Sequence, residues 1–136
     1  MNQLTLYLDP TSEPCRAVHW LCVQADIDFL IEHIWLSRNQ HLGEAFLKIN
    51  PLHQVPALKH ENLCLSEATA IMRYIADLSG KESQWFGKTQ QDRAIINQGL
   101  SWYHLNLKRV VTLEETLINL EFLATQGCVA NFKNCK

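Results

Sequence analysis

The chain has 136 residues and a formal net charge of −2 at pH 7, and 47% of its residues are hydrophobic. This length suits one domain with a small appendage, and the hydrophobic share is enough for a packed core. The slight acidity excludes the basic face that nucleic-acid binding needs. No apolar run approaches the ~18 residues that span a membrane. The first residues lack the features of a signal peptide, so we expect a cytoplasmic protein.

Five cysteines are present, and no two of them form a closely spaced Cys-x-x-Cys pair. They are Cys15, Cys22, Cys64, Cys128 and Cys135. An odd number without tight spacing is not typical of a disulfide framework, and free thiols in a reducing compartment fit better.

The first 80 residues alternate between strand and helix patterns. In chain order we predict a strand (4–8), a helix (15–25), a strand (29–34), a short helix (41–49), a hairpin (57–59 and 63–65) and a helix (66–79) that stops at Gly80. The order βαβ-α-ββα is the thioredoxin-like topology. We therefore predict a thioredoxin-like α/β domain over residues 1–80.

The rest of the chain has a different character. Residues 81–89 are charged and contain Ser and Gly, which predicts a linker with Trp85 and Phe86 as an anchor. From Gln90 the spacing of apolar residues is helical, and Thr112 to Glu115 has the spacing of a capping box. We therefore predict a short all-α region over 90–136.

Ser12 lies in the turn between the first strand and the first helix. A hydroxyl at a helix N-terminus can donate a hydrogen bond to a bound thiolate, and the helix dipole stabilises the same negative charge. Ser is also a common N-cap residue. Spacing alone leaves both roles open for Ser12.

Val55 and Pro56 separate a loop from the predicted hairpin, which suggests a cis peptide bond. Such a bond would leave the N–H and C=O of Val55 free to pair with an extended peptide ligand. The alternative is that Pro56 only begins an edge strand.

Two further features suit the ends of such a ligand. The amides that begin the helix near Glu67 can bind a carboxylate, and Glu67 itself can pair with an ammonium group. His41 can donate a hydrogen bond to a second carboxylate. The alternatives are an ordinary helix N-terminus and a solvated surface histidine.

Together these features describe a ligand with a central thiol, a backbone-like amide, a carboxylate and ammonium at one end and a carboxylate at the other. Glutathione meets that description. Six segments resemble the theta-class glutathione transferases without gaps between them. They are Leu6–Asp9, Ser12–Ala17, Gln40–Leu42, Asn50–Leu52, Val55–Leu58 and Glu67–Ile71. The resemblance extends from residue 4 to about residue 111.

The resemblance implies a glutathione transferase that conjugates the glutathione thiolate to small electrophiles, with no metal. It implies that Ser12 stabilises the thiolate, that His41 and Gln54 reach the glycine carboxylate, and that the Val55–Pro56 pair binds the cysteinyl backbone. Glu67 and position 68 would bind the γ-glutamyl end.

The resemblance also implies an electrophile site with Trp102 and Lys108, and a homodimer. Neither a nucleic-acid nor a membrane partner is expected.

Two departures from the family pattern matter. Position 68 is Ala68, where the family usually has Ser, so a side-chain hydrogen bond to glutathione is lost. Residues 90–136 match only part of the family's helical domain, as in a truncated or alternatively spliced product. The alternative function is therefore a glutathione-binding or dimerisation module with little or no catalysis.

Three rival interpretations use the same residues. Ser12 to Cys15 resembles a redox Cys-x-Pro-Cys site whose first cysteine is missing, which disfavours dithiol exchange. Tyr7 is a second possible thiol activator, but a packing role suits its place within a strand. Cys15, His19 and Cys22 share a helical face, yet they lack the fourth ligand of a structural zinc site.

Overall fold

The computed structural model describes residues 3–108. The chain divides after Asp92 into two compact units. The elements of the first unit are β1 (Leu4–Leu8), α1 (Glu13–Ala25), β2 (Phe29–His33), η1 (Leu36–Arg38), η2 (Gln40–Leu42), α2 (Glu44–Leu47), β3 (Ala57–His60), β4 (Leu63–Ser66), α3 (Ala68–Leu78) and α4 (Glu82–Phe86). The helix α5 (Gln90–Trp102) crosses the division, and the π-helical segment η3 (Tyr103–Leu107) follows it.

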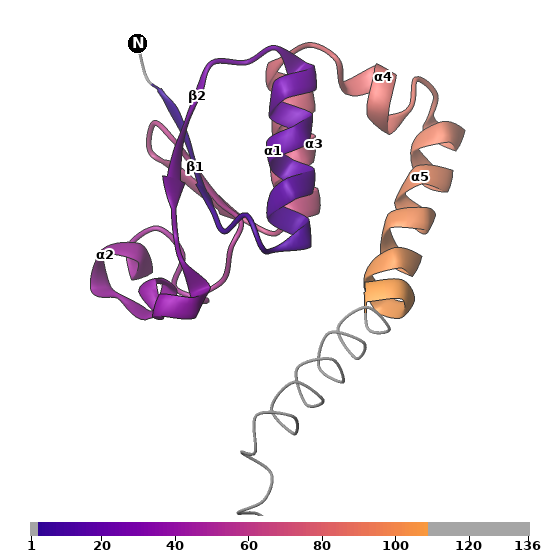
Figure 1. Ribbon diagram of the computed structural model, residues 1–136. Coiled ribbons are helices and arrows are strands. Elements are labelled where there is room, and N and C mark those ends of the chain that lie inside the picture. The colour runs from indigo at the N-terminus through magenta and orange to yellow at the C-terminus, as the bar shows by residue number, and fades with distance from the viewer. Residues whose placement is uncertain (1–2, 109–136) are drawn as a thin grey trace, which may run out of the picture. The chain divides into compact units, whose positions relative to one another are not determined.

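The four strands form one mixed sheet in the order β2-β1-β3-β4 (Figure 1). β1 pairs in parallel with β2 and antiparallel with β3, and β3 pairs antiparallel with β4. The parallel pair needs the crossover that α1 supplies. The predicted thioredoxin-like topology is confirmed.

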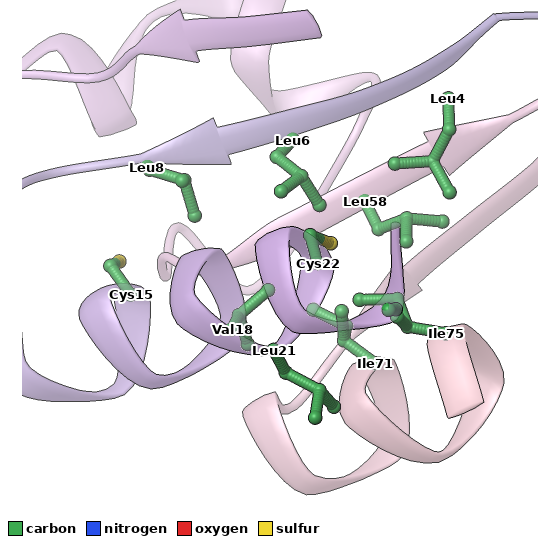
Figure 2. Close-up of a cluster of buried hydrophobic side chains, with 11 residues drawn as sticks. Leu4, Leu6, Leu8, Cys15, Val18, Leu21, Cys22, Leu58, Ile71 and Ile75 are labelled. Carbon is green, nitrogen blue, oxygen red and sulfur yellow. The ribbon is translucent and has the colours of Figure 1, made fainter. Parts of the chain in front are cut away.

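The main core lies between one face of the sheet and the helices α1 and α3, which run side by side (Figure 1). Alternate residues of β1 point to this face, as the period of two requires. Eleven side chains form the cluster, most of them labelled in Figure 2: Leu4, Leu6, Leu8, Cys15, Val18, Leu21, Cys22, Ala25, Leu58, Ile71 and Ile75.

A smaller cluster covers part of the opposite face. It joins Tyr7 of β1, Phe46 of α2 and Ala57 of β3. The rings of Tyr7 and Phe46 are tilted, with centroids 5.9 Å apart. The short helix α2 thus anchors the long connection between β2 and β3.

Local chemistry accounts for the helix ends. Pro14 occupies the first turn of α1, where a missing N–H does no harm. Asp26 ends α1 in the left-handed region (φ 59°), and its N–H donates to the carbonyl of Val23. Gly80 follows α3 with φ +69°, as its predicted role as the stop residue requires.

The structure differs from the sequence prediction in the bounds of several elements and in the predicted linker. α1 begins at Glu13, two residues earlier than predicted, and α3 begins at Ala68, two residues later than predicted. Two 3-10 turns occupy 36–42, and the helix predicted over 41–49 is the shorter α2 (Glu44–Leu47). The segment predicted as a linker contains α4. Phe86 is buried there, and the Lys81 ammonium donates to the carbonyls of Gln24 and Ala25 at the end of α1. These tertiary contacts give the segment an order that its polar composition conceals.

The helix predicted from Thr112 lies outside the described residues. Over residues 3–108, no helix is both long and apolar enough to cross a membrane.

Truncating Ile75 tests the core. Ile75 is fully buried between α3 and the sheet, so Ile75→Ala should lower the free energy of unfolding by about 2–5 kcal/mol, through lost burial and the cavity that remains. Urea unfolding measures this change. The matched control Leu52→Ala removes a side chain that is 61% exposed and should change the free energy by less than about 0.5 kcal/mol. Equal effects of the two substitutions would contradict the core assignment.

Candidate active site

Several loops of the first unit meet at one edge of the sheet. Antiparallel pairing places Tyr7 opposite Ala57, and Ala57 opposite Ser66, in one row across β1, β3 and β4. Parallel pairing adds Leu8 beside His33 at the ends of β1 and β2. The connections to α1, from β2, to β3 and to α3 therefore share this edge (Figure 1). We call it the site edge.

Ser12 is the N-cap residue of α1, yet its side chain makes no capping hydrogen bond. Its N–H donates to the Asp9 carbonyl at 3.0 Å, and its own carbonyl accepts from the Arg16 N–H at 3.1 Å. The hydroxyl lies instead within hydrogen-bonding reach of the Cys15 sulfur. The half-buried hydroxyl is thus free of the backbone and stands where the helix dipole favours negative charge.

The turn before Ser12 is organised by Asp9, which is only 2% exposed. One carboxylate oxygen accepts from the N–H and the hydroxyl of Thr11, at 2.8 and 2.7 Å. The other accepts from the N–H of Leu36, at 2.8 Å. Burial by itself would raise the pKa of Asp9, but these hydrogen bonds and the nearby His33 outweigh burial, so the pKa lies below its ordinary value.

The Val55–Pro56 bond is cis, as the sequence predicted. Within residues 3–108, neither the N–H nor the C=O of Val55 has a protein hydrogen-bond partner. Just before it, the side-chain amide of the buried Asn50 donates to the Gln54 carbonyl at 2.7 Å and accepts from the Leu52 N–H at 3.0 Å. Asn50 therefore fixes the loop that presents Gln54 and Val55, and the Gln54 side chain is exposed.

Glu67 joins β4 to α3 with an unusual backbone, φ 70° and ψ 113°. A positive φ is uncommon for a residue with a Cβ, and such residues cluster at functional sites. The Glu67 side chain is exposed and does not cap α3. α3 begins at Ala68, and the Glu67 carboxylate forms no hydrogen bond to the first N–H groups of that helix.

His41 lies in η2 and is partly buried. Its Nδ1 atom is enclosed, and no hydrogen-bond partner for it exists in the part of the chain that the structure describes. An enclosed polar atom without a partner is costly, by about 1–3 kcal/mol. Such orphaned buried atoms are rare in native structures.

Trp102 and Lys108 belong to the second unit. Trp102 is the last residue of α5 and is exposed, and Lys108 follows η3 and is partly buried. The electrophile site expected at Trp102 and Lys108 stays a prediction.

The structure argues against two alternative interpretations, Tyr7 as the thiol activator and Cys15 as part of a redox site. Tyr7 is only 8% exposed and its ring packs against Phe46 in the smaller cluster, which fits a packing role within β1. Burial raises the pKa of the Cys15 thiol more than the hydrogen bond from Ser12 lowers it. Cys15 is 1% exposed, so it is a small core residue and not a redox nucleophile.

The geometry of Cys15, His19 and Cys22 does not support a zinc site either. Cys15 and Cys22 point into the core, whereas His19 is exposed and meets the Phe29 ring edge-on at 5.7 Å. Over residues 3–108, no three His, Cys, Asp or Glu side chains gather as a metal site would require.

The sequence interpretation missed two supporting residues, Asp9 and Asn50. The local signal for Asp9 was present, because Asp followed two residues later by Thr is typical of an Asx turn. Its contact with Leu36 has no local signal, since the two residues are 27 positions apart. For Asn50, the available signal in the sequence was an Asn between a predicted helix and Pro51.

Comparison with known proteins finds relatives over the same part of the chain. Residues 2–77 match the family model "Glutathione S-transferase, N-terminal domain". Human glutathione S-transferase theta-1 is 40% identical over 106 residues, which are 78% of this chain and 44% of the relative. Dichloromethane dehalogenase of Methylorubrum extorquens is 36% identical over 106 residues, or 77% of this chain and 37% of the relative. The chain thus spans less than half the length of these relatives.

Solved structures show the same similarity. The apo form of human glutathione S-transferase T1-1 superposes with a TM-score of 0.74 at 40% identity, over 78% of this chain and 44% of that one. Human glutathione transferase theta-2, in complex with glutathione and an unknown ligand, has a TM-score of 0.72 at 32% identity, over 74% and 42%.

Replacing Asp9 tests the turn that carries Ser12. Asp9→Asn puts an amide where three donors need an acceptor, so at pH 7 it should lower the free energy of unfolding by about 1.5–3 kcal/mol. The pKa of Asp9 is lowered from 3.8 in the folded chain. The ionised carboxylate therefore stabilises the fold above about pH 4, and this contribution is lost as the pH falls through the folded pKa.

Urea unfolding of both chains between about pH 3 and pH 7 measures the effect. The control Asp77→Asn removes an exposed carboxylate from α3 and should show a much smaller difference. A difference between wild type and Asp9→Asn that stays constant down to the lowest pH would contradict the role given to the ionised carboxylate.

Proposed function

The chain belongs to the glutathione S-transferase family, and from this premise we propose that it binds glutathione at the site edge and conjugates its thiolate to small electrophiles. One observation carries the proposal. The Ser12 hydroxyl stands at the N-terminus of α1, where the helix dipole favours negative charge, and it does not cap the helix. A hydroxyl so placed can donate to the glutathione thiolate.

The remaining groups at the site edge suit the rest of glutathione. The unpaired N–H and C=O of Val55, next to Pro56, can form two hydrogen bonds to the cysteinyl backbone. The start of α3, with Glu67 and the Ala68 N–H, suits the γ-glutamyl carboxylate and ammonium. His41 and Gln54, on the connection from β2 to β3, suit the glycine carboxylate.

The chemistry is a substitution at carbon. The bound thiol releases its proton to solvent, the thiolate sulfur forms a bond to the electrophilic carbon, and the leaving group departs with the electron pair. Ser12 forms no covalent bond in this step. Its hydrogen bond, with the amide dipoles of α1, favours the thiolate over the thiol at neutral pH, so more of the nucleophile is present.

Ser12→Ala tests the mechanism directly. Loss of one hydrogen bond to a charged group, about 1.5–3 kcal/mol, should lower kcat/KM for a small halogenated electrophile at pH 7 by roughly 10- to 100-fold. The rate should recover as the pH rises, because hydroxide then supplies the thiolate. Conjugation followed spectroscopically over pH gives both results.

The control for that experiment is Ser37→Ala, an exposed serine of η1, which should leave the rate unchanged. Equal rates for wild type and Ser12→Ala at every pH would refute the role of Ser12. Retention of the wild type on immobilised glutathione without conjugation would instead favour the second candidate, a glutathione-binding module.

Ala68→Ser should strengthen glutathione binding. A serine at the first position of α3 adds a hydroxyl for the γ-glutamyl carboxylate, worth roughly tenfold in Kd. Isothermal titration with glutathione measures the gain. Ala94→Ser, the same change at an exposed position of α5, is the control. An unchanged Kd for Ala68→Ser would mean that a hydroxyl at position 68 forms no hydrogen bond to glutathione.

Homodimerisation and an electrophile site with Trp102 and Lys108 stay predictions from the resemblance. A cytoplasmic location and the division into residues 1–80, 81–89 and 90–136 stay predictions from the sequence pattern.

A further inference from the structure

Asp9 connects two segments that are far apart in the sequence. One of its carboxylate oxygens closes the turn that leads to Ser12, through the N–H and hydroxyl of Thr11. The other binds the N–H of Leu36, the first residue of η1. At 2% exposure the carboxylate is too enclosed to contact an external ligand.

On the Leu36 side, the chain forms a closed loop. The Trp35 N–H donates to the side-chain oxygen of Gln40 at 2.9 Å. The Trp35 carbonyl accepts from the N–H groups of Arg38 and Gln40, at 3.1 and 3.3 Å. Residues 35–40 are therefore tied to one another, and His41 follows directly. Where Asp9 fixes Leu36, it also fixes the base of the segment that presents His41.

On the Ser12 side, the turn is closed from two directions. The Ser12 N–H donates to the Asp9 carbonyl, and the Arg16 guanidinium donates to the carbonyls of Pro10 and Thr11, at 3.2 and 2.7 Å. The backbone that carries Ser12 therefore has little freedom relative to Asp9.

We propose that Asp9 is a positioning residue of the glutathione site, whose carboxylate fixes the distance between the Ser12 hydroxyl and the His41 side chain. This inference rests on the proposed function, because Ser12 would meet the thiol and His41 the glycine carboxylate of one ligand. A ligand that reaches both groups gains from a preset distance, since less ordering remains for binding. A negative charge near the thiolate does not assist ionisation, so the benefit of Asp9 is geometric.

Two ligands separate this role from general stability. Glutathione spans the whole site, whereas γ-glutamylcysteine lacks the glycine and cannot reach His41. Asp9→Asn should weaken glutathione binding by about tenfold and γ-glutamylcysteine binding by less than about twofold. Titration calorimetry at a temperature where the variant is folded measures both. Asp77→Asn, the same change at an exposed carboxylate of α3 outside the site, is the control and should change neither by more than about twofold.

A double-mutant cycle tests whether Asp9 acts through His41. His41→Ala alone should weaken glutathione binding by about tenfold, and adding Asp9→Asn should weaken it little further, because both changes remove the same contact. Independent effects would multiply to about 100-fold. If Asp9→Asn does not fold, Gln40→Ala opens the loop of residues 35–40 from an exposed position and should show the same preference for weakening glutathione.

The outcomes distinguish this inference from the proposed function. If the wild type binds neither ligand, the proposed function fails and the inference fails with it. The wild type can bind glutathione while the positioning role still fails. That role is overturned if Asp9→Asn or Gln40→Ala weakens the binding of both ligands equally. It is also overturned if the effects of Asp9→Asn and His41→Ala on glutathione binding multiply.

Discussion

The antiparallel pairing of β1 with β3 is the constraint on which the rest of the first unit depends. It sets Leu6 against Leu58 on the face covered by α1 and α3, and Tyr7 against Ala57 on the face covered by α2. A slip of one residue would send each of these side chains to the opposite face. The same register brings the Ser12 turn, the Val55–Pro56 loop and the start of α3 to one edge. Core packing and site assembly therefore have a common origin.

At that edge the polar groups are arranged in a way that a purely structural role would not favour. The side chains of Ser12 and Glu67 form no capping hydrogen bond to the helices that these residues precede, and Glu67 has a positive φ. His41 has an enclosed nitrogen without a partner among residues 3–108. Each feature is unfavourable by a modest amount in the free protein. Their concentration at one edge is what a site prepared for a polar ligand requires, whereas the rest of the described core is apolar and well packed.

Buried polar residues behind the site supply the rigidity that these groups lack. Asp9 and Asn50 are the two buried polar residues of the described chain. Each forms hydrogen bonds with backbone groups of the loops that carry the site residues. Interior hydrogen bonds to backbone amides are stronger than exposed ones because water does not compete for them. The loops of the site edge can therefore keep a defined shape without regular secondary structure.

Residue order and local pattern determined the elements of this protein. Alternation in residues 4–8, Pro14 in the first turn of a helix and Gly80 after another are read by neighbouring residues alone, and the structure has them as predicted. The six segments that resemble the theta-class glutathione transferases likewise indicated the family, which the comparisons show. Only the tertiary structure decided that the Ser12 hydroxyl leaves the helix uncapped and that Asp9 binds Leu36 from 27 positions away. Local preferences depend on a few adjacent side chains, whereas these contacts exist only after sheet pairing and helix packing have brought distant segments together.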